Sequence, residues 1–238
     1  MREQLTSILQ RISAAAERVG RDPREVTVTA VTKTVPPDRI REYEVLARAL
    51  GLRPVIGESY LTEFAAKVEF IDLSVEKRFI GVLSASQVPR IWRLFDVIET
   101  LGDFKTMEAC AAQMKKGGNV PRLLIQVNIS EDPGKAGFYP NDIAQALVFA
   151  RESRLRIGGF MTITERYDEG CDDVRRDYRA LAALARQLRE SREFHEAPFE
   201  SSSGELSMGM SADFEVAVEE GATHIRLGSS LFGKRPAR

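Results

Sequence analysis

Val26-Thr27-Val28-Thr29-Ala30-Val31-Thr32-Lys33 is a run of β-branched and apolar residues that ends on a lysine, just before Thr34-Val35-Pro36-Pro37. Such a run predicts a buried strand followed by a loop. Because side chains alternate along a strand, Lys33 shares a face with Thr27, Thr29 and Val31. A lysine at a strand end usually just reaches into solvent. Whether Lys33 has a function therefore depends on which other residues the fold brings near it.

The composition bounds the class of protein. The chain has 238 residues, with 34 basic and 35 acidic side chains and a formal net charge of -1. This balance gives no electrostatic reason to expect nucleic acid or an anionic membrane as the main partner. Cys110 and Cys171 form neither a disulfide framework nor a metal-ligand spacing. The first residues open directly into an amphipathic pattern, and no run approaches the ~20 apolar residues of a membrane span. We therefore expect a cytoplasmic protein.

Further strand-like runs alternate with segments of helical spacing. After the first strand, strands are expected at 53–58, 78–83, 95–100, 122–129, 156–163, 205–209 and 223–228. Helices are expected at 1–20, 36–50, from 60 onward, and at 88–94, 107–115, 143–150, 174–188 and 211–218. Ser211 is expected to cap the last of these helices. The acidic stretch 168–173 could suggest a cation site, but we favour placing Asp172 and Asp173 at the positive end of the next helix.

Eight strands that alternate with helices predict a (β/α)8 TIM barrel with an extra N-terminal helix at 1–20. The whole chain, 1–238, is then expected to form a single domain. The main alternative is a doubly wound open sheet, but no glycine-rich dinucleotide turn follows the first strand.

Possible functional groups converge at the carboxyl ends of the strands, where such barrels bind their ligands. In 223–228, the apolar Ile225 and Leu227 should meet helices, which turns Arg226 inward. An inward arginine requires an acceptor, either a ligand anion or an internal carboxylate. Gly228-Ser229-Ser230 and Ser207-Met208-Gly209-Met210-Ser211 together form a plausible anion cradle. The alternative for both glycine stretches is an ordinary tight turn.

A strand-end lysine, an anion cradle and an inward arginine suit two kinds of chemistry. One is a lysine-based aldolase that forms a Schiff base with a phosphorylated substrate. The other is pyridoxal 5′-phosphate (PLP), held by an imine to the lysine, by its phosphate and by a group that faces the pyridine nitrogen.

Nearly the whole chain resembles the pyridoxal phosphate homeostasis protein family. The motifs that carry the resemblance are, in order, 30–34, 57–58, 79–81, 126–130, 159–161, 206–211 and 225–233. The resemblance implies a barrel of the alanine racemase type, and we expect it without the β-domain of racemases because the chain ends soon after Gly233. By position, Lys33 would carry the imine and Arg226 would face the pyridine nitrogen. The phosphate would be held by Ser207, the backbone at Met208, Gly228 and Ser229.

The implied function is a PLP carrier or regulator in intracellular PLP homeostasis, with little turnover. A racemase-like PLP enzyme and an aldolase without PLP stay open as alternatives. PLP is the expected cofactor, apo PLP-enzymes are possible recipients, and the expected state is a monomer or weak dimer. Three sites depart from the family pattern, and all are expected at the barrel mouth. Ser59 replaces an asparagine, Arg78 replaces a histidine, and 84–87 replaces a stretch with glutamine, asparagine and lysine.

Overall fold

The fold is a closed barrel of parallel strands, seen in a computed structural model that describes residues 1–164, 173–191, 198–199 and 204–233. Each strand pairs with the next one along the chain, and β8 pairs with β1 to close the ring. The strands are β1 (Thr27–Val31), β2 (Val55–Glu58), β3 (Glu76–Phe79), β4 (Val97–Leu101), β5 (Arg122–Gln126), β6 (Ile157–Met161), β7 (Glu205–Met210) and β8 (His224–Leu227). The predicted TIM barrel is confirmed.

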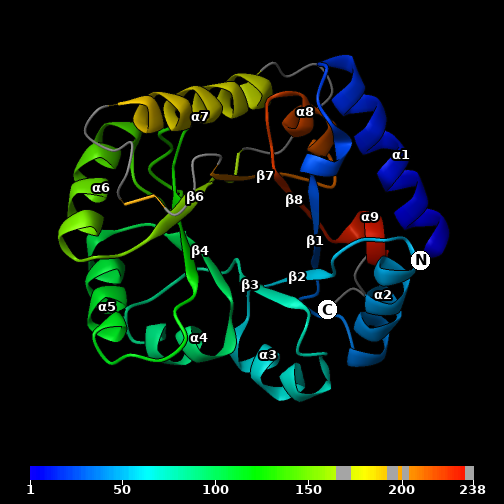
Figure 1. Cartoon of the computed structure of the whole chain (residues 1–238), viewed down its shortest axis with the longest axis horizontal. Coiled ribbons are helices and arrows are strands. Elements are labelled where there is room, and N and C mark those ends of the chain that lie inside the picture. The colour runs from blue at the N-terminus through cyan, green and yellow to red at the C-terminus, as the bar shows by residue number, and fades with distance from the viewer. Residues whose placement is uncertain (165–172, 192–197, 200–203, 234–238) are drawn as a thin grey trace.

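Helices form a ring around these strands (Figure 1). They are α1 (Arg2–Arg18), α2 (Pro37–Ala49), α3 (Leu61–Lys67), α4 (Val88–Leu94), α5 (Phe104–Met114), α6 (Ile143–Glu152), α7 (Asp173–Glu190), α8 (Phe214–Glu219) and α9 (Ser229–Phe232), with short 3-10 turns at Pro23–Glu25, Val68–Phe70 and Pro140–Asp142. The extra helix α1 packs on α8 and α9, as expected of an N-terminal helix outside the barrel. Among the described residues, no helix combines the length and the apolar character that crossing a membrane requires.

The core has two parts because strand side chains alternate between the helices and the barrel axis. The larger part lies between strands and helices, and on β1 it includes Val28 and Ala30. The smaller part is an apolar cluster of Val97, Leu124 and Met161. Several charged side chains are also buried among the strands, so much of the barrel interior is polar.

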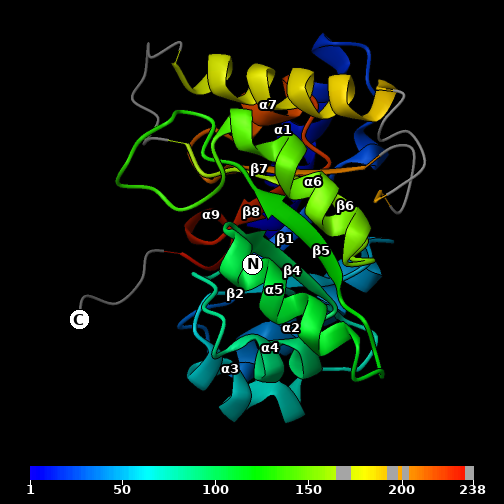
Figure 2. The same ribbon diagram turned by 90° about the vertical axis from the view of Figure 1, so that its left-hand side faces the viewer.

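The carboxyl ends of the strands form the mouth of the barrel. Figure 2 shows the loop between β5 and α6, in bright green, extending beyond these ends. Two polar side chains hold this loop: Gln126, the last residue of β5, donates to the carbonyl of Ala136 at 2.9 Å, and Asn128, two residues further on, donates to the carbonyl of Asp132 at 2.7 Å. The loop is thereby fixed to the strand from which it leaves.

Three local predictions need correction. Strand β3 begins at Glu76, two residues earlier than expected, because its first charged side chains are paired inside the barrel and do not mark a loop. Helix α8 starts after Asp213, whose Oδ1 accepts from the Met210 amide at 2.6 Å, so Ser211 is not the cap. The helical turn α9 was not expected. Asp173 begins α7 as predicted, whereas Asp172 and Cys171 lie outside the described residues.

Candidate functional site

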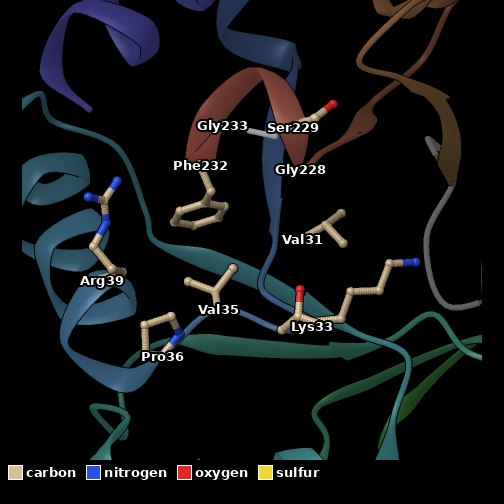
Figure 3. Close-up of a pocket in the computed structure, with 10 residues that line it drawn as sticks. Val31, Lys33, Val35, Pro36, Arg39, Gly228, Ser229, Phe232 and Gly233 are labelled. Carbon is tan, nitrogen blue, oxygen red and sulfur yellow. The ribbon is translucent and has the colours of Figure 1, made fainter. Parts of the chain in front are cut away.

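A cavity of about 460 Å³ opens at the carboxyl ends of the strands. Its lining comes from segments far apart in sequence: Val31, Lys33, Ser59, Ile80, Ile163, Met210, Ser211, Ala212, Arg226, Gly228 and Ser229. A second cavity of about 220 Å³ adjoins it and shares Val31, Lys33, Gly228 and Ser229 (Figure 3). Four of the predicted site residues, Lys33, Arg226, Gly228 and Ser229, are thus brought together.

Lys33 follows the end of β1 and is half-buried. Its Nζ lies 3.5 Å from Oγ of Ser59, the residue that directly follows β2. In Figure 3 the side chain extends away from Phe232 and Arg39, which line the smaller cavity. The amine is therefore directed toward the larger cavity, and Ser59 lies at the mouth as predicted.

A second lysine, which the sequence analysis did not single out, fixes the loop that carries Lys33. Lys67 of α3 is 5% exposed, and its Nζ donates to the backbone carbonyl of Thr32 at 2.8 Å. Its counter-ions are Glu58, at 2.6 Å, and Glu63, at 2.8 Å. Glu63 also accepts from the backbone amide of Thr34 at 2.7 Å, and Thr34 has a positive φ of 64°. These contacts hold a strained backbone.

Arg226 points into the barrel, as the alternation on β8 predicts, and it is 5% exposed. Its Nη1 donates to Oγ of Ser207 at 2.8 Å, and its Nη2 donates to the backbone carbonyl of Thr162 at 2.7 Å. The Ser207 hydroxyl in turn donates to Glu99 at 2.6 Å. A hydroxyl thus separates the guanidinium from the nearest carboxylate in this chain of contacts, and Arg226 still lines the cavity.

The prediction that Arg78 lies at the mouth is wrong. Arg78 is fully buried, and its guanidinium pairs with Glu76 at 2.7 Å, with Glu99 at 2.6 Å and with Glu205. As the third residue of a strand that begins at Glu76, it projects among the strands below the cavity. Burial alone would lower the pKa of Arg78, but the attraction of the three carboxylates raises it. The stretch 84–87 forms the turn before α4, where Ser84 donates to Gln87 at 2.9 Å.

Ser207 and Met208 do not line the cavity, whereas Met210 and Ser211 do. Ser207 is fully buried beside Arg226, and Met208 belongs to the helix-facing core. Ser211 lies at the mouth, with its Oγ 3.0 Å from Oγ of Ser230. Position 209, between these residues, requires a glycine: its φ is 93°, and an added Cβ would lie 2.5 Å from Cβ of Ala217.

Unlike position 209, position 228 does not require a glycine for its backbone conformation or for packing within the protein. Its φ of -113° is open to other residues, and an added Cβ would meet only Val31, 3.5 Å away, which is ordinary van der Waals contact. Since Gly228 lines both cavities, a side chain there would occupy space at the mouth. Helix α9 begins at the next residue, Ser229, and the amide of its second residue, Ser230, donates to Oγ of Ser211 at 3.4 Å.

The cavity therefore combines an amine, a buried guanidinium, a hydroxyl and unobstructed backbone. An amine can attack a carbonyl carbon, the guanidinium can donate to a ring nitrogen or an oxyanion, and hydroxyls with backbone amides suit a phosphate. A ligand that carries a carbonyl group, a ring nitrogen or oxyanion that accepts a hydrogen bond, and a phosphate would match this set.

Known proteins share this chain's sequence over nearly its full length. The sequence profile of the family described as alanine racemase, N-terminal domain, matches residues 6–236. The chain is 36% identical over 235 residues to the pyridoxal phosphate homeostasis protein of Aquifex aeolicus (strain VF5), covering 98% of this chain and 97% of that protein. It is 34% identical over 235 residues to the protein of the same name from Pseudomonas aeruginosa PAO1, covering 98% and 95%.

A solved structure has the same fold. PipY of Synechococcus elongatus PCC7942, solved with PLP bound, superposes with a TM-score of 0.76 at 27% identity, covering 95% of this chain and 100% of that chain. With the profile match and the identity to curated relatives over nearly the full length, these results establish that the chain belongs to the family of pyridoxal phosphate homeostasis proteins, which is built on the alanine racemase N-terminal domain.

Proposed function

We propose that this protein binds PLP at Lys33 and acts in intracellular PLP homeostasis as a carrier or regulator. The observation that carries the proposal is the shared cavity: the Lys33 amine and the Arg226 guanidinium line it together with Ser211, Gly228 and Ser229. The relatives named for PLP homeostasis and the PLP-bound PipY structure support the same ligand.

The residues present fit PLP in their chemistry. PLP offers an aldehyde to an amine, a ring nitrogen to a donor and a phosphate to hydroxyls and amides. Lys33 supplies the amine, because the other lysine nearby, Lys67, is buried and bound to Glu58, Glu63 and the Thr32 carbonyl. At Gly228 the missing side chain leaves room that protein packing does not fill.

Each residue then has a distinct role. Lys33 forms the covalent link to the cofactor, and Arg226 donates a hydrogen bond to the ring nitrogen. Ser211, Gly228 and the backbone at Ser229 hold the phosphate, a role for which the lining favours Ser211 over Ser207 and Met208.

An arginine at position 226 also favours a carrier over a catalyst. When bound, PLP supplies an electron-withdrawing ring, which works best in catalysis when a carboxylate faces a protonated ring nitrogen. Arginine is a permanent cation with donors and no acceptor, so it favours the unprotonated ring. We therefore expect little or no turnover of free amino acids.

Several wider properties belong to the same proposal. The whole chain, 1–238, acts as one PLP-binding barrel domain located in the cytoplasm, as a monomer or weak dimer. Apo PLP-enzymes are its recipients, and neither nucleic acid nor a membrane is a partner.

A titration followed by absorbance tests the function. Adding PLP to the purified protein should produce a visible band that borohydride bleaches, and Lys33→Ala should abolish the band, whereas Lys105→Ala on the exposed side of α5 should leave it unchanged. The loaded protein should then restore activity to an apo PLP-enzyme. Absence of the band would favour an aldolase without PLP, and efficient amino-acid racemisation lost in Lys33→Ala would favour the enzyme.

A further inference from the structure

A chain of hydrogen bonds runs from Arg226 into the interior of the barrel. Arg226 donates to Ser207 at 2.8 Å, Ser207 donates to Glu99 at 2.6 Å, and Arg78 donates to the other oxygen of Glu99 at 2.6 Å. Arg226 is 5% exposed and the other three residues are fully buried. Water therefore has little access to this chain, and each of its partners is supplied by the protein.

The direction of these bonds is fixed by the residue types. A guanidinium has donors only and a carboxylate has acceptors only, so the Ser207 hydroxyl must accept from Arg226 and donate to Glu99. A residue without a hydroxyl at position 207 would leave a buried donor and a buried acceptor unsatisfied. It would also remove the group that separates Arg226 from Glu99.

Glu99 is held in place by Arg78, which is itself held by two more carboxylates. Arg78 pairs with Glu76 and Glu205, and these carboxylates also pair with Arg122, at 3.1 and 2.5 Å. Because the fully buried Arg78 is paired with three carboxylates at once, Glu99 has little freedom to move.

We propose that Ser207 and Glu99 are positioning residues, which set how the Arg226 guanidinium faces the ring nitrogen of the ligand, and that Arg78 anchors Glu99 for this purpose. The inference rests on the proposed function. Nη1 donates one N–H to Ser207, and Nη2 donates one N–H to the Thr162 carbonyl. These two bonds fix the orientation of the guanidinium and so the direction of its remaining N–H groups. The site is thereby specific for an aromatic ring whose nitrogen accepts a hydrogen bond.

The test compares PLP with PLP methylated on the ring nitrogen, which carries a positive charge there and cannot accept. The wild-type protein should prefer PLP. Ser207→Ala should weaken PLP binding on the order of tenfold and leave the methylated analogue nearly unaffected, so the preference collapses. Ser207→Thr, which keeps the hydroxyl, should retain the preference. Ser13→Ala removes a serine-to-glutamate hydrogen bond on α1 and serves as the matched control.

Two results would overturn the inference: a Ser207→Ala protein that keeps the wild-type preference, or one that loses both ligands equally, as a purely structural role predicts. Should Ser207→Ala fail to fold, Glu99→Gln provides the same comparison, because its amide cannot satisfy both Arg78 and the Ser207 hydroxyl. The wild-type titration with PLP separates the two proposals: no binding there refutes the proposed function, whereas binding with an unchanged preference in the variants refutes only the positioning role.

Discussion

The ammonium of Lys67 lies 2.6 Å from Oε1 of Glu58, and both side chains are buried beneath the loop that carries Lys33. Thr32 completes the contact, since its Oγ1 donates to the same Glu58 oxygen at 2.6 Å and its carbonyl accepts from Lys67 at 2.8 Å. Burial raises the pKa of Glu58 although the hydrogen bonds from Lys67 and Thr32 act in the opposite direction. The backbone carbonyl of the residue directly before Lys33 is thus held by a buried side chain of α3.

Lys67→Met should destabilise the protein and weaken PLP binding. The substitution leaves Glu58 buried without its cation, which costs about 3 to 5 kcal/mol in comparable buried pairs. Denaturant unfolding measures this loss, with Lys105→Met on α5 as an exposed control expected to stay within about 0.5 kcal/mol of wild type. A Lys67→Met protein as stable as that control would show that the pair does not support the loop.

Gly228→Ala and Gly209→Ala should change different properties: the first PLP binding, the second stability. At Gly228 the backbone and the protein neighbours accept a Cβ, so the variant should fold normally, yet bind PLP about 1 to 3 kcal/mol more weakly because the methyl group occupies ligand space. At Gly209 the positive φ and the close Ala217 Cβ should lower the unfolding free energy. Thermal melts without ligand and PLP titrations separate the two effects. Normal PLP affinity in Gly228→Ala would argue against ligand at this position.

Ser211→Ala should weaken binding of PLP but not of pyridoxal, which has no phosphate. Loss of one hydrogen bond to a charged group corresponds to about 1.5 to 3 kcal/mol. Competitive titration with the two ligands measures the difference. Equal weakening of both would place Ser211 away from the phosphate.

His224→Gln should flatten the dependence of stability on pH below about 6.5. Burial lowers the pKa of His224 well below 6.5, and Arg78, Arg122, Arg53 and Arg226 lower it further, so the imidazole stays neutral although Glu205 lies 3.6 Å away. The unfolded state then binds one more proton, so stability falls as pH drops below 6.5, by about 1.4 kcal/mol per pH unit. Unfolding free energies between pH 5 and 8 should lose this slope in the variant, and an unchanged slope would assign it to other groups.

The sequence predicted the barrel because strand and helix periodicities alternate clearly, and it predicted the inward Arg226 because Ile225 and Leu227 define the opposite face. It failed where one short motif carries two functions. The stretch from Ser207 to Ser211 passes from the barrel interior to the mouth across Gly209, and nothing in residue type tells which serine meets the ligand. The charged start of β3 was missed for a related reason. Arg78 has the sequence character of a surface residue until Glu99 of β4 and Glu205 of β7 are brought to it in space, and Glu76 until Arg122 of β5 is brought to it.

Peptide mapping shows directly whether PLP is attached to Lys33. The wild-type protein is loaded with PLP, reduced with borohydride and digested, and the pyridoxyl group is located by mass spectrometry. The adduct is expected on Lys33, because Lys67 is buried among two carboxylates and a carbonyl. An adduct found mainly on Lys67 or Lys135, with Lys33 unmodified, would contradict it.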